Sequence, residues 1–247
     1  MVKGRDIATI SHYVLPRRQA AKRHYGVHPF FTRRAWNVVQ EYIRNFTTQG
    51  DTVLDPFGGS GVTAIEALVL GRRSIHVDIS PLANFITEQI ATSPVDTIKL
   101  NDGFLAVQKK SMGRILELYE KPDAEIAQQE VPYWYPTGVR LPPNADVDFV
   151  DQLFTPRCLC ALSILLHHIK EVRDRKVRSL LLLAFSATLG KVNRTFVSTK
   201  GRAESRGGST IFSIYRYHVP DNPVELNVWN QAECLPRKEA CADSSVT

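Results

Sequence analysis

The chain has 247 residues, 43% of them hydrophobic, and carries a formal net charge of +6 at pH 7. This length is enough for one large domain or two small ones with a real hydrophobic core. No apolar run reaches the length of a transmembrane helix, and residues 1–20 lack the apolar centre of a signal peptide. We therefore expect a cytoplasmic protein with no membrane partner.

The cysteines and histidines do not have the spacing of a metal site. Cys158 and Cys160 are too close together for a zinc-binding pair, and no second pair follows them. We expect reduced thiols and no bound metal. The adjacent His167 and His168 are expected to be ordinary surface or core residues of a helix.

Charge is distributed unevenly along the chain. Residues 1–50 hold nine Lys/Arg against two acids, residues 51–156 hold eight against fifteen, and residues 157–218 hold twelve against three. An acidic middle therefore lies between two basic segments, and basic segments favour a polyanionic partner. Charge alone leaves open the alternative of a solvated basic face.

Hydrophobic periodicity and capping residues predict the following elements in chain order. We expect a helix over Arg33–Phe46, a strand over Thr52–Asp55, a helix over Gly61–Leu70, a strand over Ser74–Asp78 and a helix over Leu82–Ala91, which Ser80 and Pro81 begin. Further helices are expected over residues 104–119, 155–172 and 178–189, with a proline-rich loop over 122–144. The first strand, helix and strand form a βαβ unit with a parallel sheet.

These elements divide the chain into three expected regions. An N-terminal arm and a Rossmann-like α/β region cover residues 1–121, and a helical and basic region covers 122–229. Residues 230–247 are expected to form an irregular tail, because they have no period and no core-forming residues.

The junction between the first strand and its helix is rich in glycine. Gly58, Gly59 and Gly61 allow the backbone to approach a ligand closely, and the helix that follows offers free backbone N–H groups. Asp78 stands at the end of the second strand, where a carboxylate can accept hydrogen bonds from both hydroxyls of a ribose. The pattern predicts a ligand that contains a ribose.

Two ligand classes fit this turn. Residues 59–64, "GSGVTA", match the dinucleotide pattern G-x-G-x-x-A, which would indicate an NAD-dependent oxidoreductase. S-adenosylmethionine (SAM) also has a ribose and an adenine, but it carries an ammonium group in place of the phosphates. Asp55 precedes the glycines and would repel a pyrophosphate while attracting an ammonium, so the electrostatics favour SAM.

The string "LDPFGGSGVTAIEALVLGRRSIHVDISPLA" resembles the SAM-binding motifs of the amino-group DNA methyltransferases, which modify adenine N6 or cytosine N4. The family pattern is close to D-P-F-x-G-S-G-T-T, then G-R, then a strand that ends in D/E-I-N/S-P. This chain has Val62 in place of the first threonine. The resemblance is specific over about residues 24–91, and it implies a Rossmann-like methyltransferase fold with a mostly parallel sheet, of which this chain need not hold every strand.

The resemblance also implies a cofactor, SAM, and the residues that bind it. Asp55 would hold the methionine ammonium, the turn would pass under the cofactor, Asp78 would bind the ribose, and Ile79 would lie against the adenine. The upstream "YGVHPFFTRR" resembles a segment that packs on the methionine end of SAM. The lysine that usually follows this segment is absent, so a role of Arg33 in binding SAM stays open. The expected cofactor-binding residues are Asp55, Pro56, Phe57, Gly58, Gly59, Ser60, Gly61, Asp78, Ile79, His28, Pro29 and Phe30.

The catalytic motif of the family, D/N/S-P-P-Y/F/W, does not occur in the sequence. In the family its first residue and a proline carbonyl accept hydrogen bonds from the target NH₂, and its aromatic residue stacks on the flipped base. The nearest string, residues 141–144, has leucine and asparagine at the two functional positions. We therefore assign no catalytic residue, and expect a chain truncated before this motif, which a C-terminal half or a partner subunit would carry.

The basic segment over residues 191–216 holds six Lys/Arg and interleaved aromatic residues, which suit a nucleic-acid backbone with splayed bases. Together with the resemblance, it predicts DNA as partner, and a role in restriction and modification, phage defence or regulation. The expected contacts are Lys191, Arg194, Lys200, Arg202 and Arg206. Three alternatives to a DNA amino-methyltransferase stay open: an NAD-dependent oxidoreductase, an RNA methyltransferase, and a non-catalytic remnant that binds SAM or DNA.

Overall fold

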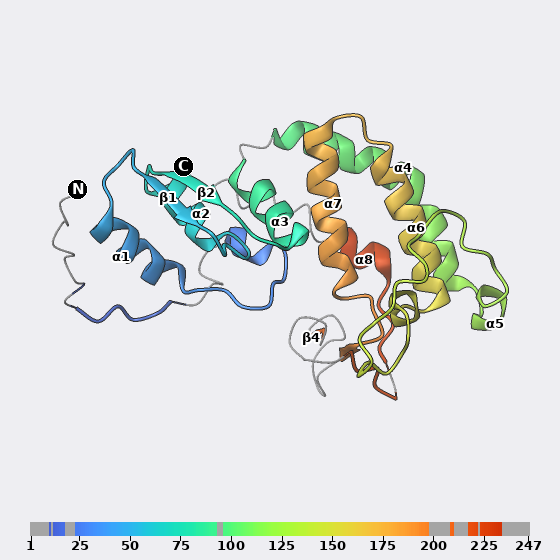
Figure 1. Cartoon of the computed structure of the whole chain (residues 1–247). Helices are drawn as coiled ribbons and strands as arrows, with labels where there is room; N and C mark the ends of the chain where they lie inside the picture. The colour runs from blue at the N-terminus through green and yellow to red at the C-terminus, as the bar shows by residue number, and fades with distance from the viewer. Residues whose placement is uncertain are drawn as a thin grey trace. The chain divides into compact units, whose positions relative to one another are not determined.

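The computed structural model describes residues 10, 12–17, 23–92, 96–197, 208–209, 217–221 and 223–233. The chain forms two compact units, which Figure 1 draws with their elements labelled. The α/β unit contains residues 1–26, 30–94 and 241–247, and the helical unit contains residues 27–29 and 95–240. Each unit has its own elements and is described by itself.

The α/β unit is built around one strand–helix–strand crossover. Strands β1 (Thr52–Asp55) and β2 (Arg73–His76) pair in parallel, and α2 (Val62–Val69) connects them (Figure 1). The register sets Leu54 beside Ile75 and Asp55 beside His76. Parallel strands end at the same edge of a sheet, so the glycine turn and the segment after β2 meet there. The predicted βαβ unit and its Rossmann-like class are confirmed.

Helices α1 (Trp36–Phe46) and α3 (Pro81–Ala91) complete the α/β unit, preceded by a short 3₁₀ turn over Arg23–Gly26. The first helix begins three residues later than predicted because Ala35 has an extended backbone. Helix α3 begins as expected, with Pro81 in its first turn and the Ser80 hydroxyl accepting from the Ala83 amide at 3.4 Å.

A buried carboxylate joins three of these elements. Glu66 on α2 has no exposed surface, and its two oxygens accept hydrogen bonds from the Tyr25 hydroxyl at 2.7 Å and the Gln40 amide at 2.5 Å. Buried polar groups of this kind are stable only when they are hydrogen-bonded. The contact therefore fixes the 3₁₀ turn and α1 against the helix that follows the glycine turn.

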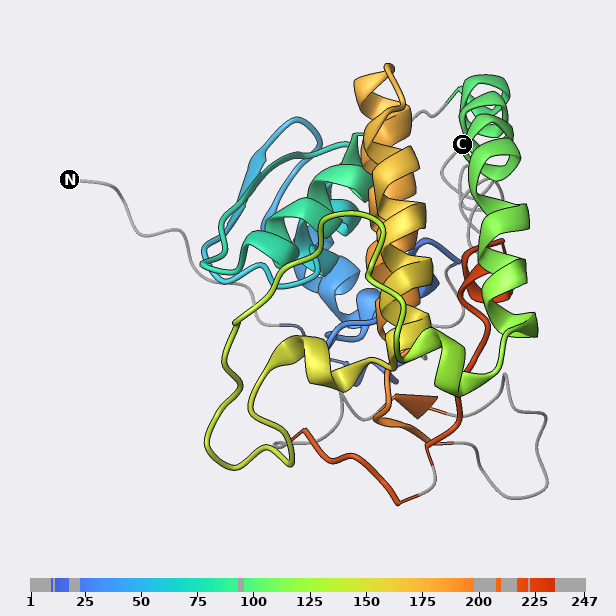
Figure 2. The same cartoon turned by 90° about the vertical axis from the view of Figure 1, so that its right-hand side faces the viewer.

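The helical unit packs around three long helices. These are α4 (Thr97–Glu120), α6 (Pro156–Lys170) and α7 (Arg175–Leu189), which contact one another pairwise and also contact the short α8 (Val228–Glu233). Figure 2 shows the three long helices close together. Shorter elements are α5 (Asp123–Ile126), a 3₁₀ turn η3 (Val150–Leu153), and the antiparallel pair β3 (Phe196–Val197) and β4 (Gly208–Ser209). No helix in the described residues is long and apolar enough to span a bilayer.

The division between the units falls near residue 94, whereas the sequence placed the end of the first region at residue 121. Helix α4 begins at Thr97, seven residues before the predicted start, where the Asp96 carboxylate accepts from the Ile98 and Lys99 amides. It then packs along α6 and α7. Gly103 weakened the helical pattern, but a Cβ there would lie 2.5 Å from a Val177 methyl, so this glycine permits the close packing of α7.

Arg157 at the start of α6 is the central polar contact of the helical unit. Its side chain is 8% exposed, pairs with Asp123 and Glu225, and donates to the carbonyls of Leu118 and Lys121. One guanidinium therefore joins the end of α4, helix α5 and the segment before α8 to α6. Its planar group of five donors suits several acceptors at once.

Replacing Arg157 with Ala should destabilise the helical unit by about 1–3 kcal/mol, because it leaves the buried Leu118 carbonyl without this donor. Urea denaturation followed by circular dichroism measures this change. The exposed Arg140, whose guanidinium lies 5.6 Å from the Phe149 ring, is the control, and Arg140→Ala should cost under about 0.5 kcal/mol. Equal losses in the two variants would contradict the central role of Arg157.

Candidate functional site

The glycine turn after β1 has a backbone that only glycine adopts readily. Gly59 and Gly61 have φ angles of 53° and 80°, and Gly61 directly precedes α2. The Gly58 amide donates to the Val77 carbonyl at 3.0 Å, and the Gly61 amide donates to the Gly58 carbonyl at 2.9 Å. The turn is therefore closed on itself and bonded to the end of β2.

Close packing on the turn also requires glycine at positions 58 and 61. A Cβ on Gly58 would lie 2.0 Å from His76 Nδ1, and a Cβ on Gly61 would lie 2.5 Å from the Thr87 side chain. The first contact comes from β2 and the second from α3. The turn is thus held between these two elements without room for a methyl group at either position.

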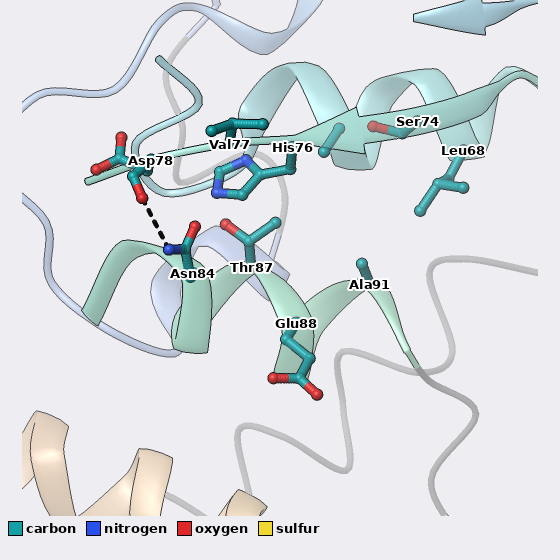
Figure 3. Close-up of a pocket in the computed structure, with 10 residues that line it drawn as sticks. Leu68, Ser74, His76, Val77, Asp78, Asn84, Thr87, Glu88 and Ala91 are labelled. Carbon is teal, nitrogen blue, oxygen red and sulfur yellow. Dashed lines mark hydrogen bonds between the residues drawn. The ribbon is translucent and has the colours of Figure 1, made fainter. Parts of the chain in front are cut away.

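Asp78 connects the turn to the start of α3. One carboxylate oxygen accepts from the Gly59 amide and the other from the Ser80 amide, both at 2.8 Å. The backbone N–H groups of Ser80 and Gly59 hold the pKa of Asp78 below its usual range, so the side chain is ionised at neutral pH. Asn84 donates to the Asp78 backbone carbonyl at 2.8 Å (Figure 3). Each carboxylate oxygen keeps a further lone pair for a ligand hydroxyl.

Two residues outside the glycine motif hold the turn from either side. Arg33 donates through Nε to the Ser60 hydroxyl at 3.0 Å and also contacts the Tyr25 carbonyl. The Thr87 hydroxyl lies 3.4 Å from the Gly59 carbonyl. Burial lowers the pKa of Arg33, although an arginine stays charged at neutral pH. Arg33 therefore supports the turn through Ser60. The contact of Thr87 with the turn could not be predicted from the spacing of residues in the sequence.

A pocket of about 420 Å³ lies beside the turn, between α2, β2 and α3 (Figure 3). His76 and Ser74 point into it from β2, and the ring nitrogens of His76 and the hydroxyl of Ser74 are buried without hydrogen-bond partners in the described structure. Unpaired buried polar atoms are costly, and a ligand or further polypeptide could satisfy them. The lining residues are Ala64, Leu68, Ser74, His76, Val77, Asp78, Asn84, Thr87, Glu88 and Ala91.

The structure brings most of the predicted cofactor-binding residues together. Asp55 accepts from the Phe57 amide at 3.1 Å, and Phe30 would lie 3.5 Å from a Cβ on Gly59. Phe57 and Ile79 are exposed apolar side chains at this edge of the sheet, 87% and 101% accessible. Their accessibility leaves both available to a ligand.

The binding roles of all these residues stay predictions, as do those of the remaining ones. His28 and Pro29 belong to the helical unit, where His28 Nε2 lies 3.0 Å from the Ser186 hydroxyl. Lys191 contacts Gln231 at 3.3 Å, and Arg194 donates to the Gln152 carbonyl at 3.0 Å. The remaining expected DNA contacts, Lys200, Arg202 and Arg206, lie outside the described residues.

Gly58→Ala should destabilise the α/β unit by about 1–3 kcal/mol because the new methyl group overlaps the His76 ring. Adding His76→Ala should recover part of that loss, since it removes the overlapping atoms. A double-mutant cycle on the free energy of unfolding measures the coupling, with His76→Ala alone as the reference. If the two changes in the free energy of unfolding are strictly additive, the methyl group at position 58 and the His76 ring do not interact.

Comparison with known proteins places the N-terminal part of the chain. Residues 6–88 match the model of the DNA methylase family, which supports the predicted family. Relatives include the type II methyltransferase M.MjaII of Methanocaldococcus jannaschii, 22% identical over 74% of this chain and 42% of its own length. M.MvaI of Kocuria varians is 24% identical over 71% of this chain and 32% of its own.

A third relative is more similar in sequence, over a shorter stretch. M.BsoBI of Geobacillus stearothermophilus is 46% identical, but over 52 residues, which are 21% of this chain and 10% of the relative. The chain therefore spans less than half the length of each of these relatives. No solved structure gives a significant match.

Proposed function

We propose that this chain, whose residues 6–88 belong to the DNA methylase family, is the SAM-binding part of a methyltransferase that acts on an exocyclic amino group of adenine or cytosine in DNA. The observation that carries the proposal is the glycine turn between two carboxylates. Asp55 stands at the end of β1, and Asp78, two residues after β2, accepts from the Gly59 amide of the turn.

The residues at the carboxyl edge of the sheet fit SAM by their chemistry. The ionised Asp78 can accept from ribose hydroxyls, the exposed Ile79 can lie against an adenine, and Asp55 suits the ammonium of the methionine part. SAM, when bound, supplies a methyl group on a positively charged sulfur. Two carboxylates and no lysine or arginine among residues 51–71 make the same edge a poor place for a pyrophosphate.

The two-stranded sheet has an uncovered face, which supports a further polypeptide in the working enzyme. Leu54, Ile75 and Val77 are 50–58% exposed, and the register puts Leu54 beside Ile75 on one face. Parallel sheets in proteins normally have both faces covered. A C-terminal half or a partner subunit that covers this face could also carry the acceptor–proline–proline–aromatic motif that the chain lacks.

The match to the DNA methylase family supports DNA as the substrate, and the type II methyltransferase names of the relatives support restriction and modification as the setting. A cytoplasmic location is part of the same proposal. The helical unit is then the candidate for DNA contact. The missing catalytic motif favours one competing function, a chain that binds SAM without transferring its methyl group.

Calorimetric titration of the purified chain with SAM should give saturable binding, and NAD should give none. Asp78→Asn should weaken SAM binding at least tenfold, because it replaces a charged acceptor for ribose hydroxyls by a neutral amide. Asp102→Asn, the same change at an exposed position on α4, is the control and should leave the affinity unchanged. Binding of NAD in place of SAM would overturn the cofactor assignment in favour of an oxidoreductase.

The chain alone should transfer no methyl group to DNA, even where it binds SAM, because its sequence lacks the acceptor–proline–proline–aromatic motif. Incorporation of radiolabelled methyl from SAM into DNA measures this activity. Methylation of DNA by the chain alone would contradict the inference that the motif comes from elsewhere. Methylation of RNA instead of DNA would show that the protein is an RNA methyltransferase.

A further inference from the structure

The loop after α5 places a large aromatic side chain on the surface of the helical unit. Trp134 is 67% exposed, and the Lys170 ammonium lies 4.5 Å from the centre of its ring. A cation over an indole face is a favourable contact even in water. Because both residues are exposed, the pair presents one positive charge and one flat apolar ring to a partner at the same place.

A second stack lies next to this pair. The Tyr133 ring lies parallel to the His167 ring at 3.8 Å, and the Arg114 guanidinium lies 5.3 Å from the Tyr133 ring. Arg114 also donates to the Tyr133 hydroxyl at 2.8 Å. These contacts hold the loop between α4 and α6, which run close together (Figure 2), so the aromatic residues form a fixed surface.

Basic side chains gather beside these rings. Residues 103–116 of α4 hold three Lys/Arg and no acid, and residues 167–173 at the end of α6 hold two Lys/Arg and one acid. That acid, Glu171, is paired with Lys110 at 2.8 Å. Several cations beside exposed aromatic rings match a nucleotide chain, which offers phosphates and flat bases together.

We propose that this surface, formed by Arg114, Tyr133, Trp134, His167 and Lys170, contacts nucleic acid. The proposal rests on the proposed function for its choice of DNA. Arg114 and Lys170 meet backbone phosphates, and Trp134 packs against an unstacked base or its sugar. The surface lies outside the basic segment over residues 191–216 that the sequence singled out.

The neighbouring histidines do not favour a metal ion at this place. His167, His168 and Glu171 offer three ligand atoms within 4.8 Å of one another. However, the Lys110 ammonium already contacts Glu171, and the bonds from Lys110 and His168 lower the pKa of Glu171 to about 2. A divalent cation would have to displace or approach this ammonium, whereas phosphates are attracted by the same charges.

Fluorescence anisotropy of a labelled oligonucleotide, single-stranded and as a duplex, tests the proposal over a series of salt concentrations. The double variant Arg114→Gln/Lys170→Gln should bind more weakly, with the slope of log K against log salt reduced by about 0.7 per contact on a single strand and about 0.9 on a duplex. Trp134→Ala should weaken single-strand binding about tenfold and leave the slope unchanged.

The control is Lys99→Gln, on the same helix as Arg114 but near its first turn and paired with Asp96. It removes one charge and should leave affinity and slope nearly unchanged. The single variant Lys170→Gln, which also removes one charge, is measured beside it. An equal loss of affinity in these two single variants would overturn the proposal, since binding would then follow net charge alone. Equal binding of polyglutamate would also overturn it, in favour of an acidic protein partner.

Titration with SAM tests the cofactor site independently of this surface. All four substitutions lie in the helical unit, so SAM affinity should be that of the wild type. A chain that binds SAM but no oligonucleotide refutes the surface and leaves the cofactor assignment standing. A chain that binds oligonucleotide through these residues but no SAM supports the surface and refutes the cofactor site.

Discussion

The carboxylate of Asp78 is the interaction on which the candidate site depends. It accepts one amide from the glycine turn and one from the start of α3, and so joins two segments that lie 19 and 2 residues away in the chain. A charged acceptor for backbone amides is worth more than a neutral one. The turn and the start of α3 are therefore positioned by one side chain, which also lines the pocket beside the turn.

Steric exclusion and polar contacts both hold the turn in one conformation. His76 and Thr87 leave no room for a side chain at Gly58 and Gly61, while Arg33 holds Ser60 from the side of α1. The residues that shape the turn thus come from β2, from α3 and from the segment before α1. Such support from outside the motif keeps binding groups in place before a ligand arrives, which lowers the entropic cost of binding.

The βαβ unit and its turn could be predicted because their signals are local. Alternating apolar residues, glycines at a strand end and Ser80 before Pro81 each act within a few positions. The start of α4 could not be predicted in this way. Gly103 is a poor helix former, and the reason for a glycine there is its close packing against Val177, which is distant in sequence. The contacts of Arg33 with Ser60 and of Lys170 with Trp134 depend equally on tertiary packing, and no spacing rule reveals them.

The uncovered face of β1 and β2 has a consequence for the life of the chain in the cell. Outside the pairing with β1, the edge of β2 has no neighbouring strand in the described residues, and Leu54 and Ile75 present apolar surface beside it. An open strand edge next to exposed apolar residues is a template for pairing with other chains. If the proposed second polypeptide covers this face, a copy of the chain without it would be prone to aggregation and a target for chaperones and proteases, so the two parts would have to be supplied in matched amounts.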